Sequence, residues 1–139
     1  MSAKTKNLLA ILLVLIAATV FFALRGTGSV TIDTDGDGLR FSGPEGSTYL
    51  AYDSITDIRF LPSPDYGSAA DGGARRGVLY GTWQSGDLGT YSAYVNEGIP
   101  CCILFVSDAE TVAFNYESEA TTQGFYDSIR ALWLEKTAA

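Results

Sequence analysis

The sequence contains no histidine, and this absence narrows the chemistry available to the chain. Histidine is the commonest general base, the partner of serine and cysteine nucleophiles, and the usual zinc and copper ligand. Lysine offers little in its place, because Lys4 and Lys6 precede a hydrophobic segment and Lys136 lies near the C-terminus. We therefore expect a protein that is not an enzyme, with no catalytic residue, metal ion or cofactor.

Basic residues are also scarce, with nine Lys and Arg against 16 Asp and Glu and a formal net charge of −7. Three of the nine precede residue 26, so the rest of the chain has six basic and 16 acidic residues and a charge of −10. Nucleic acid is not expected as a partner, because phosphate binding requires a basic surface that displaces counterions. Anionic lipid headgroups are disfavoured for the same reason.

The only cysteines, Cys101 and Cys102, are neighbours in an apolar run over residues 99–106. Successive side chains of a strand point to opposite faces, so the two thiols would diverge instead of bonding or sharing a metal. The pattern favours plain buried thiols. A strained vicinal disulfide is the alternative.

One long hydrophobic run is present, at residues 8–24, with two lysines before it and Arg25 after it. As a helix its 17 residues span roughly 25 Å, slightly less than a hydrocarbon core of about 30 Å. The more basic N-terminal flank places the N-terminus in the cytoplasm. We predict a cytoplasmic N-terminus and transmembrane signal-anchor helix in residues 1–26. Residues 27–139 would form a domain on the extracytoplasmic side of the cell membrane.

A cleaved signal peptide is the alternative interpretation of this run. Its apolar stretch is usually about 7 to 15 residues long and ends in a pair of small residues spaced one apart. Gly26 and Gly28 would provide a tolerable cleavage site. The longer run favours a retained anchor.

The domain reads as mainly β, because short segments with apolar alternation are separated by Gly, Asp, Asn and Pro. Residues 62–74 are rich in Gly, Pro, Ser and Asp and are expected to form a long mobile loop. About seven to eight strands are expected, at residues 30–32, 39–41, 48–52, 55–61, 77–83, 88–96, 99–106 and 111–115.

The C-terminal segment changes to a helical period. Its large apolar residues fall at i, i+4, i+7 and i+8, which defines one face of a helix. These residues are Phe125, Ile129, Leu132 and Trp133. We predict an amphipathic helix over residues 119–136, capped at its N-terminus by Ser118 or Thr121.

A run of strands followed by one closing helix resembles the bacterial pleckstrin-homology-like (PH-like) domains of short membrane-anchored proteins. The resemblance covers most of residues 29–134 and is a pattern of apolar and glycine positions. It is carried by residues 52–58 (YDSITDI), 76–81 (RGVLYG), 88–91 (LGTY), 94–96 (YVN), 103–105 (ILF), 112–115 (VAFN) and 125–129 (FYDSI).

This resemblance implies a PH-like antiparallel β-barrel or sandwich of about seven to eight strands, capped by the C-terminal amphipathic helix. It also implies a binding or scaffolding module without a catalytic centre. Phosphoinositide binding does not carry over, because the opening hairpin is acidic and only Arg75 and Arg76 are adjacent basic residues.

Asp33, Asp35 and Asp37, followed by Gly38, match the first half of a calcium-binding loop. The twelfth position of such a loop requires a bidentate Glu, but here it is Pro44. A turn between two strands explains the same Asp and Gly residues. We expect a hairpin turn and no calcium.

The apolar run at 99–106 suggests where a partner could bind. Cys102, Leu104 and Val106 share one strand face, and an apolar outer face must be covered by the domain's own loop or helix or by another subunit. We take these three residues as the candidate interaction surface. The expected function is a non-enzymatic, membrane-tethered PH-like interaction or scaffolding module acting on a protein partner.

An extracytoplasmic small-ligand or carbohydrate-binding module is the alternative function. Tyr80, Trp83, Tyr91 and Tyr94 could stack against a sugar or a peptide. Aromatic residues on paired strands more often form the core and cross-strand pairs.

Overall fold

The computed structural model describes residues 30–138, which form nine strands, a short 3-10 helix η1 (Tyr52–Ser54) and one α-helix, α2 (Glu119–Thr137). The strands are β1 (Thr31–Thr34), β2 (Gly38–Gly43), β3 (Gly46–Ala51), β4 (Ile55–Leu61), β5 (Ser68–Arg75), β6 (Val78–Ser85), β7 (Gly89–Asn96), β8 (Cys102–Ser107) and β9 (Thr111–Phe114). The prediction of a mainly β domain with one C-terminal helix is confirmed. The predicted anchor at residues 8–24 lies outside the described residues. Over residues 30–138, the chain forms no helix long and apolar enough to cross a membrane.

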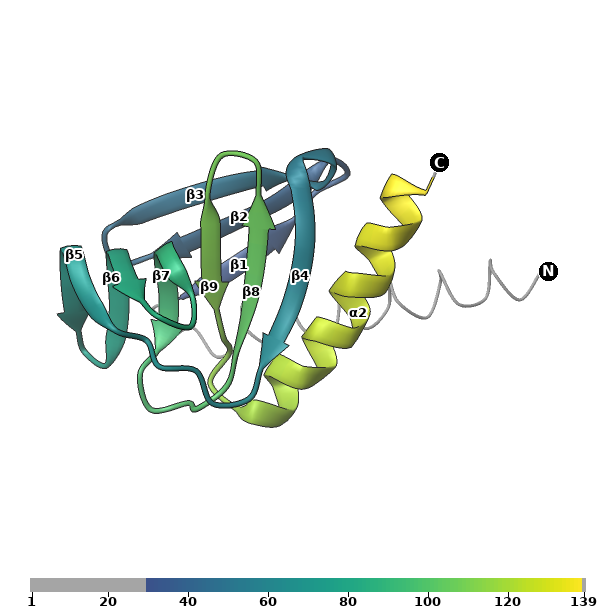
Figure 1. Cartoon of the computed structure of the whole chain (residues 1–139). Coiled ribbons are helices and arrows are strands. Elements are labelled where there is room, and N and C mark those ends of the chain that lie inside the picture. The colour runs from purple at the N-terminus through teal and green to yellow at the C-terminus, as the bar shows by residue number, and fades with distance from the viewer. Residues whose placement is uncertain (1–29, 139) are drawn as a thin grey trace.

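The strands form two sheets, one in the order β1-β2-β3 and the other in the order β4-β8-β9-β7-β6-β5 (Figure 1). Neighbouring strands are antiparallel except for β7 and β9, which run parallel. This pair departs from the all-antiparallel run expected from the sequence. It arises because the β8–β9 hairpin lies between β4 and β7 in the larger sheet.

The main core lies between the two sheets and α2. Its centre is aromatic: the Phe41 ring lies 5.0 Å from that of Phe105, and the Phe114 ring lies 4.9 Å from that of Tyr116. Edge-to-face contacts of this kind add to the stabilisation from burial. The helix contributes its predicted apolar face to this core: Phe125, Ile129, Leu132 and Trp133.

The closing helix is fixed at both ends. Ser118 is its N-cap, as predicted, and its Oγ accepts a hydrogen bond from the Thr121 amide at 3.1 Å. Near the other end, the Trp133 indole donates to the Tyr52 carbonyl at 3.2 Å. The first bond satisfies an otherwise unpaired amide of the first turn, and the second ties α2 to η1.

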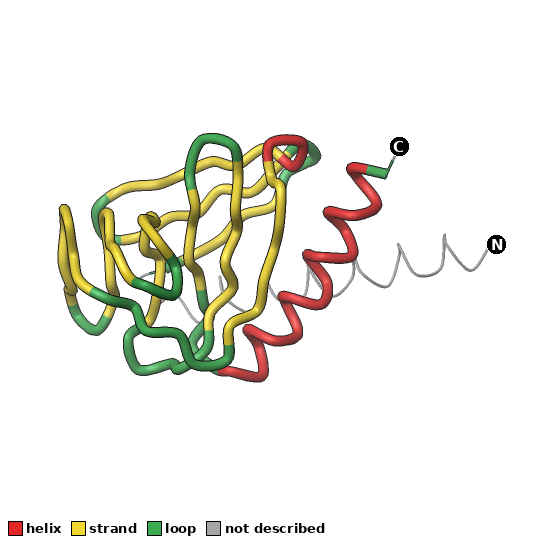
Figure 2. The backbone as a smooth tube through the Cα atoms, in the orientation of Figure 1, coloured by secondary structure: helices red, strands yellow, loops and turns green. Residues whose placement is uncertain are grey.

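The larger sheet curls strongly at its β5 end, where β5 and β6 bend at mid-length (Figure 2). Gly72 and Gly81 face each other in the β5–β6 ladder, with φ of +113° and +84°. A Cβ at Gly81 would overlap the Asp71 carbonyl oxygen. A residue with a side chain would be strained at this positive φ and would collide with the facing strand, so only glycine fits here. The glycine pair therefore permits the bend.

The predicted long loop at residues 62–74 is wrong in its second half. Residues 62–67 are a loop, but Ser68–Arg75 form β5, which pairs with β6 along its length. These residues are small and have low intrinsic strand preference. Their strand conformation comes from pairing with β6, which the local sequence does not reveal.

Candidate functional site at the free edge of β3

The face predicted to bind a partner is mostly inside the domain. The exposed fractions of Cys102 and Leu104 are 0 % and 4 %, and Val106 is half-buried. They form a second core on the opposite face of the larger sheet, together with residues such as Leu79 and Tyr91. Cys102 and Leu104 therefore do not present an exposed surface, and an interaction through them is not supported.

The domain's own loop helps to cover this second core. The Tyr66 side chain packs against it, and its hydroxyl donates to the carbonyls of Ile99 and Cys101 at 3.2 and 3.3 Å. The Tyr91 hydroxyl in turn donates to the Tyr66 carbonyl at 2.6 Å. Of the coverings predicted for the apolar strand, the structure shows one that comes from the domain's own loop. The single tyrosine in a polar loop is the sequence signal for it.

The two cysteines are buried free thiols, as predicted. Their neighbours on the strand separate into the two cores, with Ile103 in the main core and Leu104 in the second. Burial raises the pKa of Cys102 to about 12 and raises that of Cys101 as well. A thiol held in its neutral form is a poor nucleophile and a poor metal ligand.

The acidic segment near the N-terminus of the domain is the β1–β2 hairpin turn, as predicted. The Asp35 carboxylate accepts hydrogen bonds from the amides of Asp37 and Gly38, both at 2.8 Å. These two bonds lower the pKa of Asp35. The carboxylate thus closes the turn. Across residues 30–138, no group of three or more His, Cys, Asp or Glu side chains is placed to hold a metal ion.

The aromatic residues of β6 and β7 form cross-strand pairs. Tyr80 lies opposite Tyr94, and Trp83 lies opposite Tyr91. Tyr91 and Tyr94 are buried, which confirms the interpretation of these two as core residues. Tyr80 and Trp83 are half-buried, and the Trp83 indole donates to the Tyr80 carbonyl at 2.8 Å.

The free edge of β3 is the feature that sequence reasoning missed. Among the described strands β3 pairs only with β2, and it forms the outer rim of the smaller sheet (Figure 1). The Tyr52 amide donates to the Asp37 carbonyl at 2.9 Å, which fixes the phase of this ladder. Because bonded pairs alternate along an antiparallel ladder, the main-chain groups of Ser47 and Tyr49 must point away from β2. No hydrogen-bond partner for them is found in the described part of the chain.

The side chains of β3 alternate as its pairing requires. Leu50 is buried in the main core, and the Thr48 and Tyr94 hydroxyl oxygens are 2.6 Å apart and hydrogen-bonded. Tyr49 points outward and is 39 % exposed. The inward residues attach β3 to the domain, so its unpaired edge belongs to a strand whose other side is packed.

A hollow of about 190 Å³ lies beside the start of β3. It separates β3 from β6 and β7, and its lining includes Ser47, Tyr80, Ser92 and Tyr94. Glu45, in the β2–β3 turn, also lines it. The hollow therefore adjoins the same main-chain edge whose polar groups face outward.

Glu45 is paired with a residue of the other sheet. Its carboxylate accepts a hydrogen bond from the Arg75 guanidinium at 2.6 Å, which joins the β2–β3 turn to the end of β5. The two side chains are 46 % and 56 % exposed. The ion pair therefore lies at the surface, where solvent screens it.

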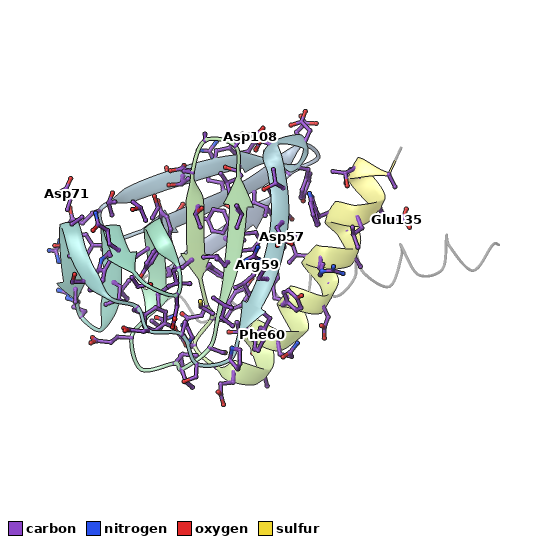
Figure 3. The ribbon with its side chains drawn as sticks, viewed as in Figure 1. Asp57, Arg59, Phe60, Asp71, Asp108 and Glu135 are labelled. Atoms are coloured by element: carbon purple, nitrogen blue, oxygen red, sulfur yellow. The ribbon has the colours of Figure 1, made fainter. Side chains whose placement is uncertain are left out.

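The other sheet edges carry features that block strand addition. β5 has a bulge between Ala69 and Asp71 and the bend at Gly72, and Figure 3 shows Asp71 projecting from it. β4 has a bulge at its start and lies beside α2, and β1 has only four residues. β3 has six residues in continuous register with β2 and contains no lysine or proline. It is the edge with the least protection against pairing.

Comparison with known protein families, with curated proteins and with solved structures found no match. The candidate site combines a six-residue edge with outward main-chain groups, an adjoining hollow and one acidic side chain that lines the hollow.

Proposed function

We propose that this chain is a non-enzymatic, membrane-tethered interaction module that adds an extended segment of a protein partner to β3. The observation that carries the proposal is the outward direction of the main-chain groups of Ser47 and Tyr49. An added strand would satisfy these donors and acceptors. In strand addition, main-chain hydrogen bonds supply affinity and adjoining pockets supply specificity.

The hollow beside β3 is suited to be the adjoining pocket that supplies specificity. A partner strand would lie about 4.8 Å from β3, over the hollow between β3 and β6. Alternate side chains of that strand would point toward Tyr80 and Ser92 or toward solvent. The hollow has room for one side chain of moderate size.

The cellular setting is part of the same proposal. A helix over residues 8–24 would hold the domain at the extracytoplasmic side of the cell membrane, where its partner would be another membrane-associated or exported protein. A PH-like architecture is consistent with two sheets and a C-terminal helix. The parallel β7–β9 pair is a difference that any assignment to that group must accommodate.

A small-ligand binder is the second candidate function, because Tyr80 and Tyr94 line the hollow. Its 190 Å³ is smaller than the roughly 300 to 1,000 Å³ of small-molecule pockets. Another hollow, of about 390 Å³, is lined mainly by hydroxyl and carboxylate groups, including those of Thr90, Ser107 and Glu110. Neither is the deep aromatic pocket that a carbohydrate binder would favour, so this function ranks second.

The proposal is tested by removing one main-chain donor. Tyr49→Pro deletes the outward amide while leaving the bonds to β2, and an edge strand tolerates proline. Tyr49→Ala, which keeps the amide, is the matched control. A photo-cross-linker at Ser47 of the full chain in membranes should trap a partner polypeptide, whereas one at the exposed Gly86 should not. Tyr49→Pro should abolish the cross-link and Tyr49→Ala should retain it. Equal cross-linking in the natural chain and in both variants would reject strand addition.

A further inference from the structure

We infer that the segment added to β3 is basic, and that one of its lysine or arginine side chains takes the place of Arg75 at Glu45. This inference rests on the proposed function and specifies the chemistry of the partner. It selects a cationic segment over a neutral strand and over a second copy of this chain.

The charge around β3 is the first argument. Glu45 precedes the strand, Asp53 follows it, and the Tyr49 hydroxyl donates to the Asp35 carboxylate at 3.4 Å. Burial raises the pKa of Tyr49, and the negative charges of Asp35 and Asp37 raise it further, against an opposite effect of Arg40. The two carboxylates thus contribute a negative field at the outward face of β3. An incoming segment that carries positive charge would be attracted by this field.

A second copy of the chain fits this edge poorly. The part of the chain after Arg25 has six basic and 16 acidic residues, so two copies would bring together two charges of −10. β3 itself has no charged residue with which to offset that repulsion. Like charges brought together at an interface select against that pairing.

The second argument is that the two nearby cations, Arg40 and Arg75, each contact a side chain of this region. Arg40 lies over the ring of Tyr49, with its guanidinium carbon 5.4 Å from the ring centroid, and Arg75 is bound to Glu45. Exposed ion pairs such as Glu45 with Arg75 contribute little to stability, so one cation can replace another there. Glu45 also lines the hollow that the partner's side chain would enter. The carboxylate is therefore in reach of both the internal and the incoming cation.

The exchange predicts opposite effects for the two members of the ion pair. Glu45→Gln keeps a hydrogen-bond acceptor but removes the negative charge, and it should weaken binding of a basic strand. Arg75→Ala removes the internal competitor and should strengthen it. Arg130→Ala is the matched control, because it removes the same charge from an exposed position on α2.

The probes are two dye-labelled peptides with the six-residue length of β3, one alternating threonine with lysine and the other threonine with glutamine. Their affinities for the full chain in a non-ionic detergent are measured by fluorescence anisotropy. The lysine peptide should bind about three- to tenfold more tightly than the glutamine peptide. Glu45→Gln should remove this advantage of the lysine peptide, and Arg75→Ala should increase it. Arg130→Ala should leave the advantage as it is in the natural chain.

The outcomes separate this inference from the proposed function. Equal binding of the two peptides, with protection of the Ser47 and Tyr49 amides from hydrogen exchange, would overturn the basic partner and keep strand addition. Concentration-dependent self-association that Tyr49→Pro abolishes would overturn the basic partner in favour of a second copy of this chain. Binding of neither peptide, with unchanged exchange at both amides, would count against strand addition itself.

Discussion

Tyr66 connects two parts of the chain that are far apart in sequence. Its hydroxyl reaches the carbonyls that precede β8, and its side chain closes one side of the second core. Backbone carbonyls in such a position need a donor once water is excluded. A single phenol therefore lets a polar loop cover an apolar strand.

The burial of Leu104 predicts that a charge there unfolds the domain. Leu104→Asp places a carboxylate in the second core with no partner, and we expect a loss of at least about 3 kcal/mol in the free energy of unfolding. Leu134→Asp, on the exposed face of α2, is the control and should cost less than about 1 kcal/mol. Chemical denaturation of the two variants measures both values. A folded, stable Leu104→Asp chain would contradict the internal position of this face.

The raised pKa of Cys102 predicts a loss of stability in alkaline solution. Its ordinary value is 9.0 and burial raises it to about 12, so between these values the unfolded chain releases a proton that the folded chain keeps. The stabilisation is therefore complete below pH 9 and is lost as the pH rises toward 12. One such proton changes the free energy of unfolding by about 1.4 kcal/mol per pH unit.

Cys102→Val tests this origin, because valine fills a similar volume without titrating. Denaturation midpoints between pH 9 and pH 10.5 should fall less steeply for the variant than for the natural chain. The remaining slope is expected from the buried tyrosines, whose pKa values are also raised by burial, as for Tyr91. Identical slopes would show that Cys102 does not titrate differently in the folded and unfolded states.

At the scale of secondary-structure elements, the β1–β2 turn is held by its own carboxylate, so we expect it to form without a cation. Asp35→Ala removes the acceptor for two turn amides and should lower the melting temperature. The decrease should be the same with and without millimolar calcium. Calcium should leave the natural chain unchanged, since a ligand at ten times its dissociation constant would add about 1.4 kcal/mol. A calcium-dependent rise in melting temperature that Asp35→Ala abolishes would instead indicate a metal site.

The elements with local signals were the predictable ones. The sequence indicates helix α2 through its apolar spacing and the cap at Ser118. It indicates β4 through a segment with apolar residues that ends at Pro62. β5 has no such signal, because Ser, Ala and Gly gain a strand conformation only by pairing with β6. The edge at β3 could not be foreseen either. Whether a strand is central or terminal depends on which distant segments pair, and no residue of β3 encodes that.

At the scale of the whole molecule, the predicted anchor would determine which compartment the β3 edge faces. A C-terminal tag should be removed by protease added to intact protoplasts, because the basic flank of residues 8–24 favours a cytoplasmic N-terminus. Mass spectrometry should find that segment still attached to the mature chain. A protected tag would reverse the orientation, and a mature N-terminus near Ser29 would identify a cleaved signal.

Two cores share the central strands of the larger sheet, and this arrangement has a consequence for how the domain folds. β8 has Phe105 in one core and Leu104 in the other, so neither core can be completed without it. Its partners are distant, since Phe105 pairs with Ile58, and β9 joins β7 only through a parallel ladder. Non-local pairing slows the search for the native state, and a strand that both halves need makes their formation interdependent. The two halves should therefore melt in one transition, with the amides of β8 and β9 the last to exchange with solvent.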